Sequence, residues 1–231
     1  MIKLVVFDWN GTLLADTLAS VESINRVLKK LGRNQTLSVK KCRETMTLPI
    51  VDFYASHGFD RDYLKKSAAL IQETFHGHYA RRAERTRTRK GARKTLSWLK
   101  ANGIERIILS NHLVTSINLS LENFRLAHLF SEVLANSDVH TVWIEKNKLR
   151  KLQDYLATKD LAPEEVMLVG DSLEEIDAAR HLGLKSVAIT DGICSRKRLK
   201  SSSPDFIIRS LSELIGVVKK SNGPSAGKKK H

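Results

Sequence analysis

The sequence predicts an α/β protein with a Rossmann-like parallel sheet core and an inserted all-helical domain. Short apolar runs of strand length alternate with amphipathic helical stretches, and the stretch from about residue 14 to residue 89 shows helical patterns without a convincing strand. Strands that alternate with helices form parallel sheets with right-handed crossovers. We therefore assign 1–14 and 90–220 to the core, 15–89 to the helical insert, and 221–231 to a disordered basic tail.

The first elements follow from apolar spacing. A strand begins at Ile2 and meets a polar turn at Asp8. Apolar residues then recur at helical intervals until Gly32 stops the pattern, and Gly58 separates two further helical stretches. The helices expected in the insert are 16–31, 49–57 and 60–79.

The alternation of strands and helices resumes after the insert. Gly103 ends a helix and leads into an apolar strand that finishes at Ser110, and a later apolar strand finishes at Asp171. Runs of four or five apolar residues bounded by turn signals are typical of buried strands. The expected strands are 106–109, 133–134, 166–169, 186–189 and 206–208, and the expected helices are 91–102, 114–124, 148–159, 173–182 and 211–218.

Composition sets limits on location and on metal binding by cysteine. No apolar run reaches the ~20 residues that a membrane-spanning helix needs, and no signal-peptide pattern precedes the first strand. We therefore expect a cytoplasmic protein without a membrane partner. The two cysteines, Cys42 and Cys194, lie far apart and match no metal-binding spacing, so neither a disulfide framework nor a zinc site is expected.

The net charge of +14 favours anionic partners. The tail is rich in small and polar residues, a composition typical of disorder. Neither the tail nor the second basic stretch, at 81–94, interleaves aromatic residues as single-stranded nucleic-acid platforms do. We favour a solvated basic surface, with a phosphate-rich substrate or nucleic acid as the alternative. Besides the tail, the charge gathers in a basic segment made of Arg81, Arg82, Arg85, Arg87, Arg89, Lys90, Arg93 and Lys94.

Three apolar strands end in the polar residues Asp8, Ser110 and Asp171. A lone Asp after a strand more often forms a turn or caps a helix. The carboxyl ends of parallel strands, however, lie on one edge of the sheet, which is where open α/β folds bind their ligands. Three such ends together with a lysine near residue 148 predict a single site.

The motifs at these strand ends resemble those of the haloacid dehalogenase superfamily. The strings are Phe-Asp-Trp-Asn-Gly-Thr at 7–12, Leu-Ser-Asn at 109–111, a lysine near 148, and Val-Gly-Asp-Ser-Leu-Glu-Glu at 169–175. The resemblance extends from Ile2 to about Val218, and the Pro-Glu-Glu at 163–165 is typical of the phosphatase branch. It implies a core of that family's fold, with the insert as a small cap that closes over the site and selects the substrate.

Carried over to this sequence, the resemblance makes Asp8 the nucleophile that attacks phosphorus and forms an aspartyl-phosphate. A Mg²⁺ ion would be held by Asp8, the backbone carbonyl of Asn10 and Asp171, and it would screen the repulsion between carboxylate and phosphate. Glu175 stands four residues after the metal aspartate. It is expected to orient the metal and its waters without binding the metal directly.

The resemblance also implies a set of phosphate-binding groups. The lysine that neutralises the phosphoryl charge is expected to be Lys148, which begins a helix, and Lys146 is the alternative because it fits another spacing of the family. A solvated surface charge is the plain alternative for either lysine. The expected phosphate-binding residues are Gly11, Thr12, Ser110, Asn111 and Lys148.

Asn10 occupies the position where the phosphatases of this family carry a second acid. An amide cannot shuttle a proton, so the loss of acid–base assistance would slow turnover by roughly 10²–10⁴. Three interpretations stay open. The substrate has a good leaving group, or His112 or a cap side chain supplies the proton, or the chain binds phosphorylated ligands with little turnover. Cap candidates for contact with the substrate are Arg43, Met46 and Tyr54.

These observations predict a Mg²⁺-dependent phosphohydrolase of a small phosphorylated metabolite. The alternative is a catalytically weak phosphate-ligand binding protein, associated with nucleic acid through its basic surface. Two other activities of the superfamily are disfavoured: Glu44 stands where phosphonoacetaldehyde hydrolases carry a Schiff-base lysine, and carbon–halogen hydrolysis does not need the metal aspartate that Asp171 resembles. Substrate identity and oligomeric state are not readable from the sequence.

Overall fold

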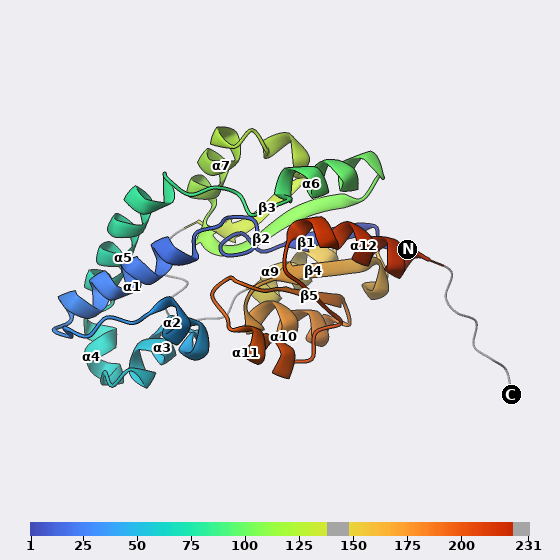
Figure 1. The fold of residues 1–231 in the computed structure, drawn as a ribbon. Helices are drawn as coiled ribbons and strands as arrows, with labels where there is room; N and C mark the ends of the chain where they lie inside the picture. Colours follow the sequence, from blue (N-terminus) through green and yellow to red (C-terminus); the bar gives the residue numbers. More distant parts are fainter. Residues whose placement is uncertain (138–147, 224–231) are drawn as a thin grey trace, which may run out of the picture.

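A computed structural model describes residues 1–137 and 148–223 and contains a six-stranded parallel sheet (Figure 1). The strand order is β3-β2-β1-β4-β5-β6, which places β1 at the centre between β2 and β4. The predicted α/β class with a parallel sheet is confirmed. The strands are β1 (Leu4–Phe7), β2 (Glu105–Leu113), β3 (Glu132–Asn136), β4 (Val166–Gly170), β5 (Lys185–Ile189) and β6 (Phe206–Ile208).

Helices cover both faces of this sheet, which explains why its central strands are apolar along their whole length. Successive side chains of β1 point to opposite faces, so Val5 and Phe7 pack in one hydrophobic cluster and Leu4 and Val6 in another. The first cluster includes α6 (Ala92–Ala101), α7 (Val114–Asn123) and α12 (Leu211–Asn222). The other face is covered by α9 (Lys148–Leu156), α10 (Leu173–Leu182) and α11 (Arg196–Ser201).

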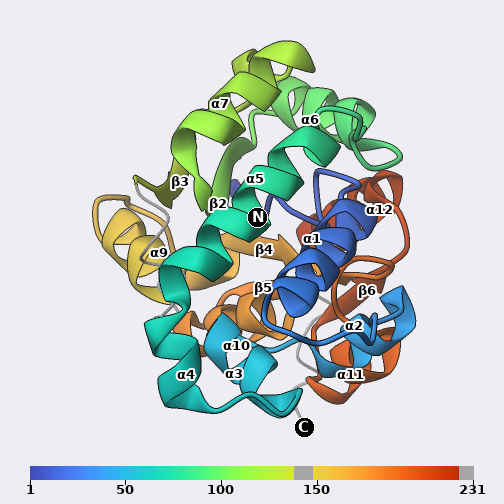
Figure 2. The ribbon, with the colours of Figure 1, turned by 90° about the vertical axis from the view of Figure 1, so that its left-hand side faces the viewer.

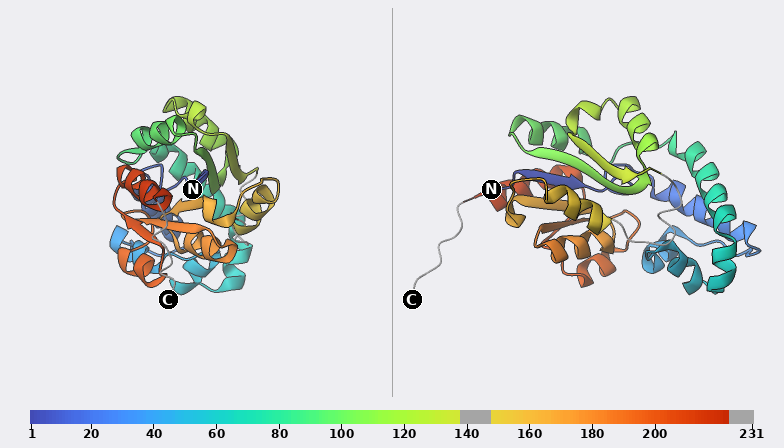
Figure 3. Two further views of the ribbon diagram at one scale, coloured as in Figure 1. Left: turned by 90° about the vertical axis from the view of Figure 1, so that its right-hand side faces the viewer. Right: turned by 180° about the vertical axis from the view of Figure 1, so that it is seen from behind.

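Five helices between β1 and α6 form the insert and gather at one end of the molecule, away from the N-terminus (Figures 1 and 2). They pack around a hydrophobic cluster of their own, in which Phe53, Tyr54, Leu64 and Ile71 are buried. The same separation of the insert from the sheet is visible from behind (Figure 3). The helices are α1 (Thr17–Lys30), α2 (Val39–Thr45), α3 (Ile50–Ser56), α4 (Arg61–Lys66) and α5 (Ala68–Ala83).

The chain enters and leaves the insert through two paired segments. Leu14 and Thr88 form an antiparallel bridge, and the backbone N–H of Ala15 donates to the Arg87 carbonyl at 2.8 Å. The Arg89 N–H donates in turn to the Leu13 carbonyl at 2.8 Å. The two connections therefore lie side by side at the edge of the core.

Several elements differ from the sequence-based expectation. The expected helix 60–79 is two helices that break at Ser67, and the second continues to Ala83. The short helices α2 and α11 were not expected, because six or seven residues give too little periodicity to read.

The last helix also runs further than expected. It ends at Asn222 rather than at 218, so Ser221 and Asn222 are helical instead of part of a disordered tail. The Asn222 side chain accepts a hydrogen bond from the Ile2 backbone N–H at 2.6 Å, which fastens this helix to the start of the chain. The rest of the predicted tail, 224–231, lies outside the described residues.

Both cysteines are buried free thiols, Cys42 in α2 and Cys194 after β5. Burial raises the pKa of each thiol, that of Cys42 to about 11. Throughout 1–137 and 148–223, no helix has both the length and the hydrophobicity needed to cross a membrane.

Candidate active site

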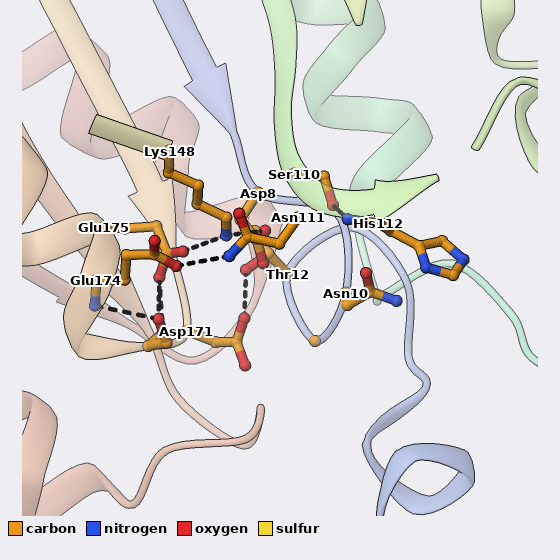
Figure 4. Close-up of polar contacts among 12 residues, drawn as sticks. Asp8, Asn10, Thr12, Ser110, Asn111, His112, Lys148, Asp171, Glu174 and Glu175 are labelled. Carbon is orange, nitrogen blue, oxygen red and sulfur yellow. Dashed lines mark hydrogen bonds and ion pairs between the residues drawn. The ribbon is translucent and has the colours of Figure 1, made fainter. Parts of the chain in front are cut away.

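Asp8 follows β1 directly and is 5 % exposed, at the centre of the sheet edge that faces the insert. The Lys148 ammonium, which comes from the first residue of α9, donates to Asp8 Oδ1 at 2.5 Å (Figure 4). The same ammonium contacts Glu175 Oε1 in α10. The structure thus brings together three charged groups from three separate elements, and all three are buried.

The charges in this cluster shift one another's protonation. Burial raises the pKa of Asp8 well above its usual range; the Lys148 ammonium opposes this shift and the Glu175 carboxylate adds to it. Burial alone would lower the pKa of Lys148, but the two carboxylates raise it well above its usual value. Lys148 therefore stays charged. The alternative lysine, Lys146, lies outside the described residues.

Asp171 follows β4 and is held by two donors. The Thr12 hydroxyl donates to its Oδ1 at 2.8 Å and the Ile193 backbone N–H to its Oδ2 at 2.6 Å. Gly11 permits this close approach, because its φ is 74° and a Cβ at that position would come within 2.2 Å of Asp171 Oδ2. Thr12 therefore supports Asp171, and its binding of phosphate stays a prediction.

Burial raises the pKa of Asp171 to about 6, and the Glu175 charge adds to the shift. A carboxyl group whose pKa is raised from 3.8 in the unfolded chain stabilises the folded state below pH 3.8, and this contribution is lost as the pH rises through about 6. In EDTA, we expect the stability of the wild type relative to Asp171→Asn to fall between pH 4 and pH 7. Urea unfolding at several pH values measures this difference in unfolding free energy between the two proteins. A difference that does not change with pH would contradict the raised pKa of Asp171. Asp177→Asn, at an exposed site on the helix that follows, α10, is the control.

Glu175 contacts Lys148 with one oxygen and caps its own helix with the other. Its Oε2 accepts from the Ser172 backbone N–H at 3.0 Å and from the Ser172 hydroxyl at 2.6 Å. This capping box fixes the Glu175 side chain against the start of α10. Its direct partner is thus the lysine, whereas the sequence-based expectation was a role in orienting metal-bound water.

Ser110 and Asn111 lie inside β2 rather than at its end, because the strand continues to Leu113. The Ser110 hydroxyl oxygen accepts from the His112 backbone N–H at 3.0 Å. The Asn111 side chain donates to Glu174 Oε2 at 2.8 Å. Glu174 is buried beside the site, although the strand-end motifs assign it no role. Only the fold shows which carboxylate of the Glu-Glu pair faces Asn111.

Asn10 is held by a network that the sequence did not reveal. Its amide nitrogen donates to Asp16 Oδ2 at 2.7 Å and to the Tyr79 hydroxyl oxygen at 2.8 Å. The Tyr79 hydroxyl donates to Asp16 Oδ2 at 2.5 Å, and the Gly11 N–H donates to Asp16 Oδ1 at 2.7 Å. Both hydrogens of the Asn10 amide therefore form hydrogen bonds, one to Asp16 and one to Tyr79. An ionised carboxylate at position 10 would have no hydrogen to donate to these oxygens.

The sequence offers no signal for this network. Asp16 stands where a helix is expected to start, but its side chain makes no cap hydrogen bond. Tyr79 stands at the end of a helical pattern, 69 residues away from Asn10. Only the packing of α5 against α1 brings these groups together.

Several members of the basic segment have structural partners. Arg89 donates to the Gly11 carbonyl at 2.8 Å and to the Thr190 carbonyl at 2.6 Å, and so ties the first loop to the end of β5. Arg82 forms a two-pronged ion pair with Glu22, and Arg93 donates to two carbonyls after α7. The segment is thus partly a set of internal braces.

A cavity of about 230 Å³ lies between the insert and the strand ends. Asn10, Gly11, Asn111 and His112 line its core side. Of the cap candidates, Met46 and Tyr54 line it. Arg43 instead donates to the Asp191 and Gly192 carbonyls at 2.7 and 2.8 Å, which fastens α2 to the core.

Comparisons with known proteins agree with this architecture. The model of the family described as haloacid dehalogenase-like hydrolase matches residues 5–189. A phosphoglycolate phosphatase from Pseudomonas putida is 25% identical over 219 residues, which cover 92% of this chain and 78% of that protein. The pyrophosphatase PpaX from Bacillus mycoides is 24% identical over 225 residues, covering 96% and 99%. The crystal structure of a predicted phosphatase from Clostridium acetobutylicum superimposes with a TM-score of 0.79 at 19% identity, covering 95% and 99%.

Proposed function

The chain belongs to the haloacid dehalogenase-like hydrolase family, and from that membership we propose that it is a Mg²⁺-dependent phosphohydrolase of a small phosphorylated molecule, acting through an aspartyl-phosphate. One observation carries the proposal: a buried carboxylate at the central strand end, Asp8, is paired with the buried ammonium of Lys148 beside a second strand-end carboxylate, Asp171. The phosphatase and pyrophosphatase relatives support the same reaction class.

Each chemical role falls to a residue of this cluster. An Asp8 oxygen attacks phosphorus in line with the bond to the leaving oxygen, which breaks and gives an aspartyl-phosphate. Water then hydrolyses this intermediate, releases phosphate and restores the carboxylate. Lys148 neutralises charge on the transferring phosphoryl group, and Ser110 donates a hydrogen bond to it. Glu175 positions the lysine through their ion pair.

The donor set at the strand ends fits a Mg²⁺ ion. Two buried carboxylates, Asp8 and Glu175, contact the buried ammonium of Lys148, and the charge of a third, Asp171, acts on Asp8, so the cluster carries an excess of negative charge. In the described part of the chain no three His, Cys, Asp or Glu side chains group to hold a metal by themselves. The proposed site would consist of two carboxylates, Asp8 and Asp171, and the Asn10 backbone carbonyl, all of them the oxygen ligands that Mg²⁺ prefers. When bound, the ion would screen the repulsion between the nucleophile and the phosphate.

The direct test is release of phosphate from para-nitrophenyl phosphate with Mg²⁺ and with EDTA. Release that depends on Mg²⁺ supports the proposal, and equal release in EDTA would exclude the metal. Should the purified protein release no phosphate from para-nitrophenyl phosphate or from the substrates of its named relatives, the hydrolase proposal fails.

Asn10 favours a second candidate, a phosphate-ligand binding protein with little turnover. The Asn10 amide cannot exchange a proton, and burial lowers the pKa of His112 to about 4, so its imidazole is neutral near pH 7 and is a poor acid. Binding of inorganic phosphate or vanadate with Mg²⁺, without any turnover, would support this candidate. Nucleic-acid association is less favoured, since Arg82, Arg89 and Arg93 of the basic segment have partners inside the protein.

The network around Asn10 predicts how an acid at this position would behave. Asn10→Asp replaces the amide with a carboxylate 2.7 Å from Asp16 Oδ2, and two like charges replace a hydrogen bond. We expect the single variant to be less stable by about 1–3 kcal/mol at pH 7. The double variant Asn10→Asp/Asp16→Asn exchanges the partners, and we expect it to recover most of this loss and to raise kcat by up to about 10².

Urea unfolding and phosphate release on both single variants and the double variant measure this coupling. Asp16→Asn alone completes the cycle. If Asn10→Asp is as stable as the wild type and the double variant is no better, the network does not restrain the loop as described.

A further inference from the structure

We propose that the cavity beside Asn10 receives the leaving group of an aryl phosphate monoester, so that the preferred substrate carries an uncharged aromatic ring rather than a carboxylate or a second phosphate. This inference rests on the proposed function. It concerns the part of the substrate that does not react, for which the strand-end cluster gives no information.

The charge of the cavity lining is the first argument. No Lys or Arg lines it in the described part of the chain, and the one charged side chain there is Asp16. Burial lowers the pKa of His76 and of His112, which favours the neutral form of both imidazoles near pH 7. An anionic leaving group, such as the glycolate carboxylate or a second phosphate, would lose its hydration there without gaining a cation.

The shape and composition of the cavity are the second argument. Apolar side chains from four parts of the insert, Ile24, Met46, Ile50 and Ile71, line it together with Phe75. Phe75 stacks on Tyr79 with ring centres 5.7 Å apart, and Tyr79 meets His112 edge to face at 5.5 Å. Aromatic walls of this kind favour a flat ring. A cavity of about 150 Å³ already holds benzene, so about 230 Å³ has room for a larger aromatic group.

Two buried polar atoms in the lining, Gln72 Oε1 and Asn111 Oδ1, have no hydrogen-bond partner among the described residues, and Gln72 is the one on the insert side. The side-chain oxygen of Gln72 is buried, and the described residues provide it with no donor. Gln72 is 8 % exposed and lines the cavity from α5. An O–H or N–H group on the aromatic ligand would satisfy this acceptor, which otherwise weakens the folded state.

Asn10 favours a phenol over an aliphatic alcohol as the leaving group, while the charge of the lining separates the phenol from a second phosphate. With no acid to protonate it, the leaving oxygen must depart as an anion, and a phenol, with a pKa of about 10, does this far more readily than an aliphatic alcohol. The P–O bond to the phenolic oxygen breaks as the Asp8 oxygen bonds to phosphorus, and the phenolate takes its proton from solvent. Water then hydrolyses the aspartyl-phosphate, so the balance is aryl phosphate plus water giving phenol and phosphate.

The test compares kcat/KM for 1-naphthyl phosphate, phosphoglycolate and pyrophosphate with Mg²⁺. We expect 1-naphthyl phosphate to be preferred by at least about tenfold. Ser20→Arg places a cation in the cavity from a partly exposed site on α1, and we expect it to reverse this preference. Ser201→Arg adds the same charge on the exposed surface of α11 and should leave the preference unchanged. Gln72→Leu should lower kcat/KM for a hydroxylated naphthyl phosphate more than it lowers kcat/KM for 1-naphthyl phosphate.

The outcomes separate the two proposals. If phosphoglycolate or pyrophosphate is hydrolysed as efficiently as the aryl phosphate, this inference is overturned and the phosphohydrolase proposal stands. If no compound is hydrolysed, the phosphohydrolase proposal fails, and calorimetric binding to the Asp8→Asn variant decides the inference. Binding of 1-naphthyl phosphate at least about tenfold tighter than phosphoglycolate supports it, and equal or weaker binding overturns it.

Discussion

Replacing Asp8 with Asn is expected to abolish Mg²⁺-dependent phosphate release, with a loss on the order of 10⁴ or more in kcat. An amide oxygen is a far weaker nucleophile than a carboxylate, so the variant could not form the aspartyl-phosphate. The fold should persist, because Lys148 keeps Glu175 as its partner. Phosphate release by the purified variant, with a circular dichroism spectrum to show that it is folded, makes the measurement.

Asp177→Asn is the matched control for this experiment. Asp177 is a half-exposed carboxylate on α10 that pairs with Arg180 at the surface, so its loss should change kcat by less than about twofold. Activity that survives in Asp8→Asn would mean that another group is the nucleophile.

Replacing Lys148 with Met is expected to give the largest loss of stability. The variant leaves Asp8 and Glu175 buried without their shared cation, and breaking a buried ion pair in this way destabilises a fold by about 3–5 kcal/mol. The pKa of Asp8 is raised, so this carboxyl group takes up a proton as the pH falls, and the loss should be smaller near pH 5 than at pH 7.5. Urea unfolding in EDTA at both pH values measures it.

Lys159→Met serves as the comparison, since Lys159 pairs with Glu105 at 3.5 Å on a partly exposed surface. A pair of this kind contributes at most about 1 kcal/mol. Equal losses for the two variants would show that the buried pair does not stabilise the fold as inferred. Phosphate release by Lys148→Met at a temperature where it stays folded then separates the role of the lysine in stability from its proposed role at the phosphate.

The sheet and the ends of β1 and β4 could be predicted because their signals are local. These two strands are continuous apolar runs, and the sheet edge follows from parallel connectivity, so Asp8 and Asp171 were expected near each other. The end of β2 was placed too early, at Ser110, because the strand continues through polar residues to Leu113. The preference for Lys148 over Lys146 came from the family resemblance, in which the lysine begins a helix. The position of Asp171 at this edge could be predicted. Its hydrogen bond from Thr12 could not be predicted, because the two residues are 159 positions apart in the sequence.

What the sequence could not supply were contacts made by packing between distant elements. Asp16 and Tyr79 look like ordinary helix residues until α5 packs against α1 and both reach Asn10. Arg89 looks like one charge among eight, and only the fold directs it to the Gly11 carbonyl. Periodicity reports which face of a helix is buried, but it does not report which side chain on another element that face meets.

The antiparallel pairing of the segments that enter and leave the insert makes the insert modular. Leu14 and Thr88 are already neighbours, so a chain that joined them directly would close almost without loss of conformational entropy. Inserts of different size could thus be exchanged at this junction while the sheet stayed intact. The exchange would alter the site chemically, because Asp16 and Tyr79 both belong to the insert whereas Asn10 belongs to the core. Any insert grafted onto this core must therefore supply its own hydrogen-bond acceptors for the Asn10 amide.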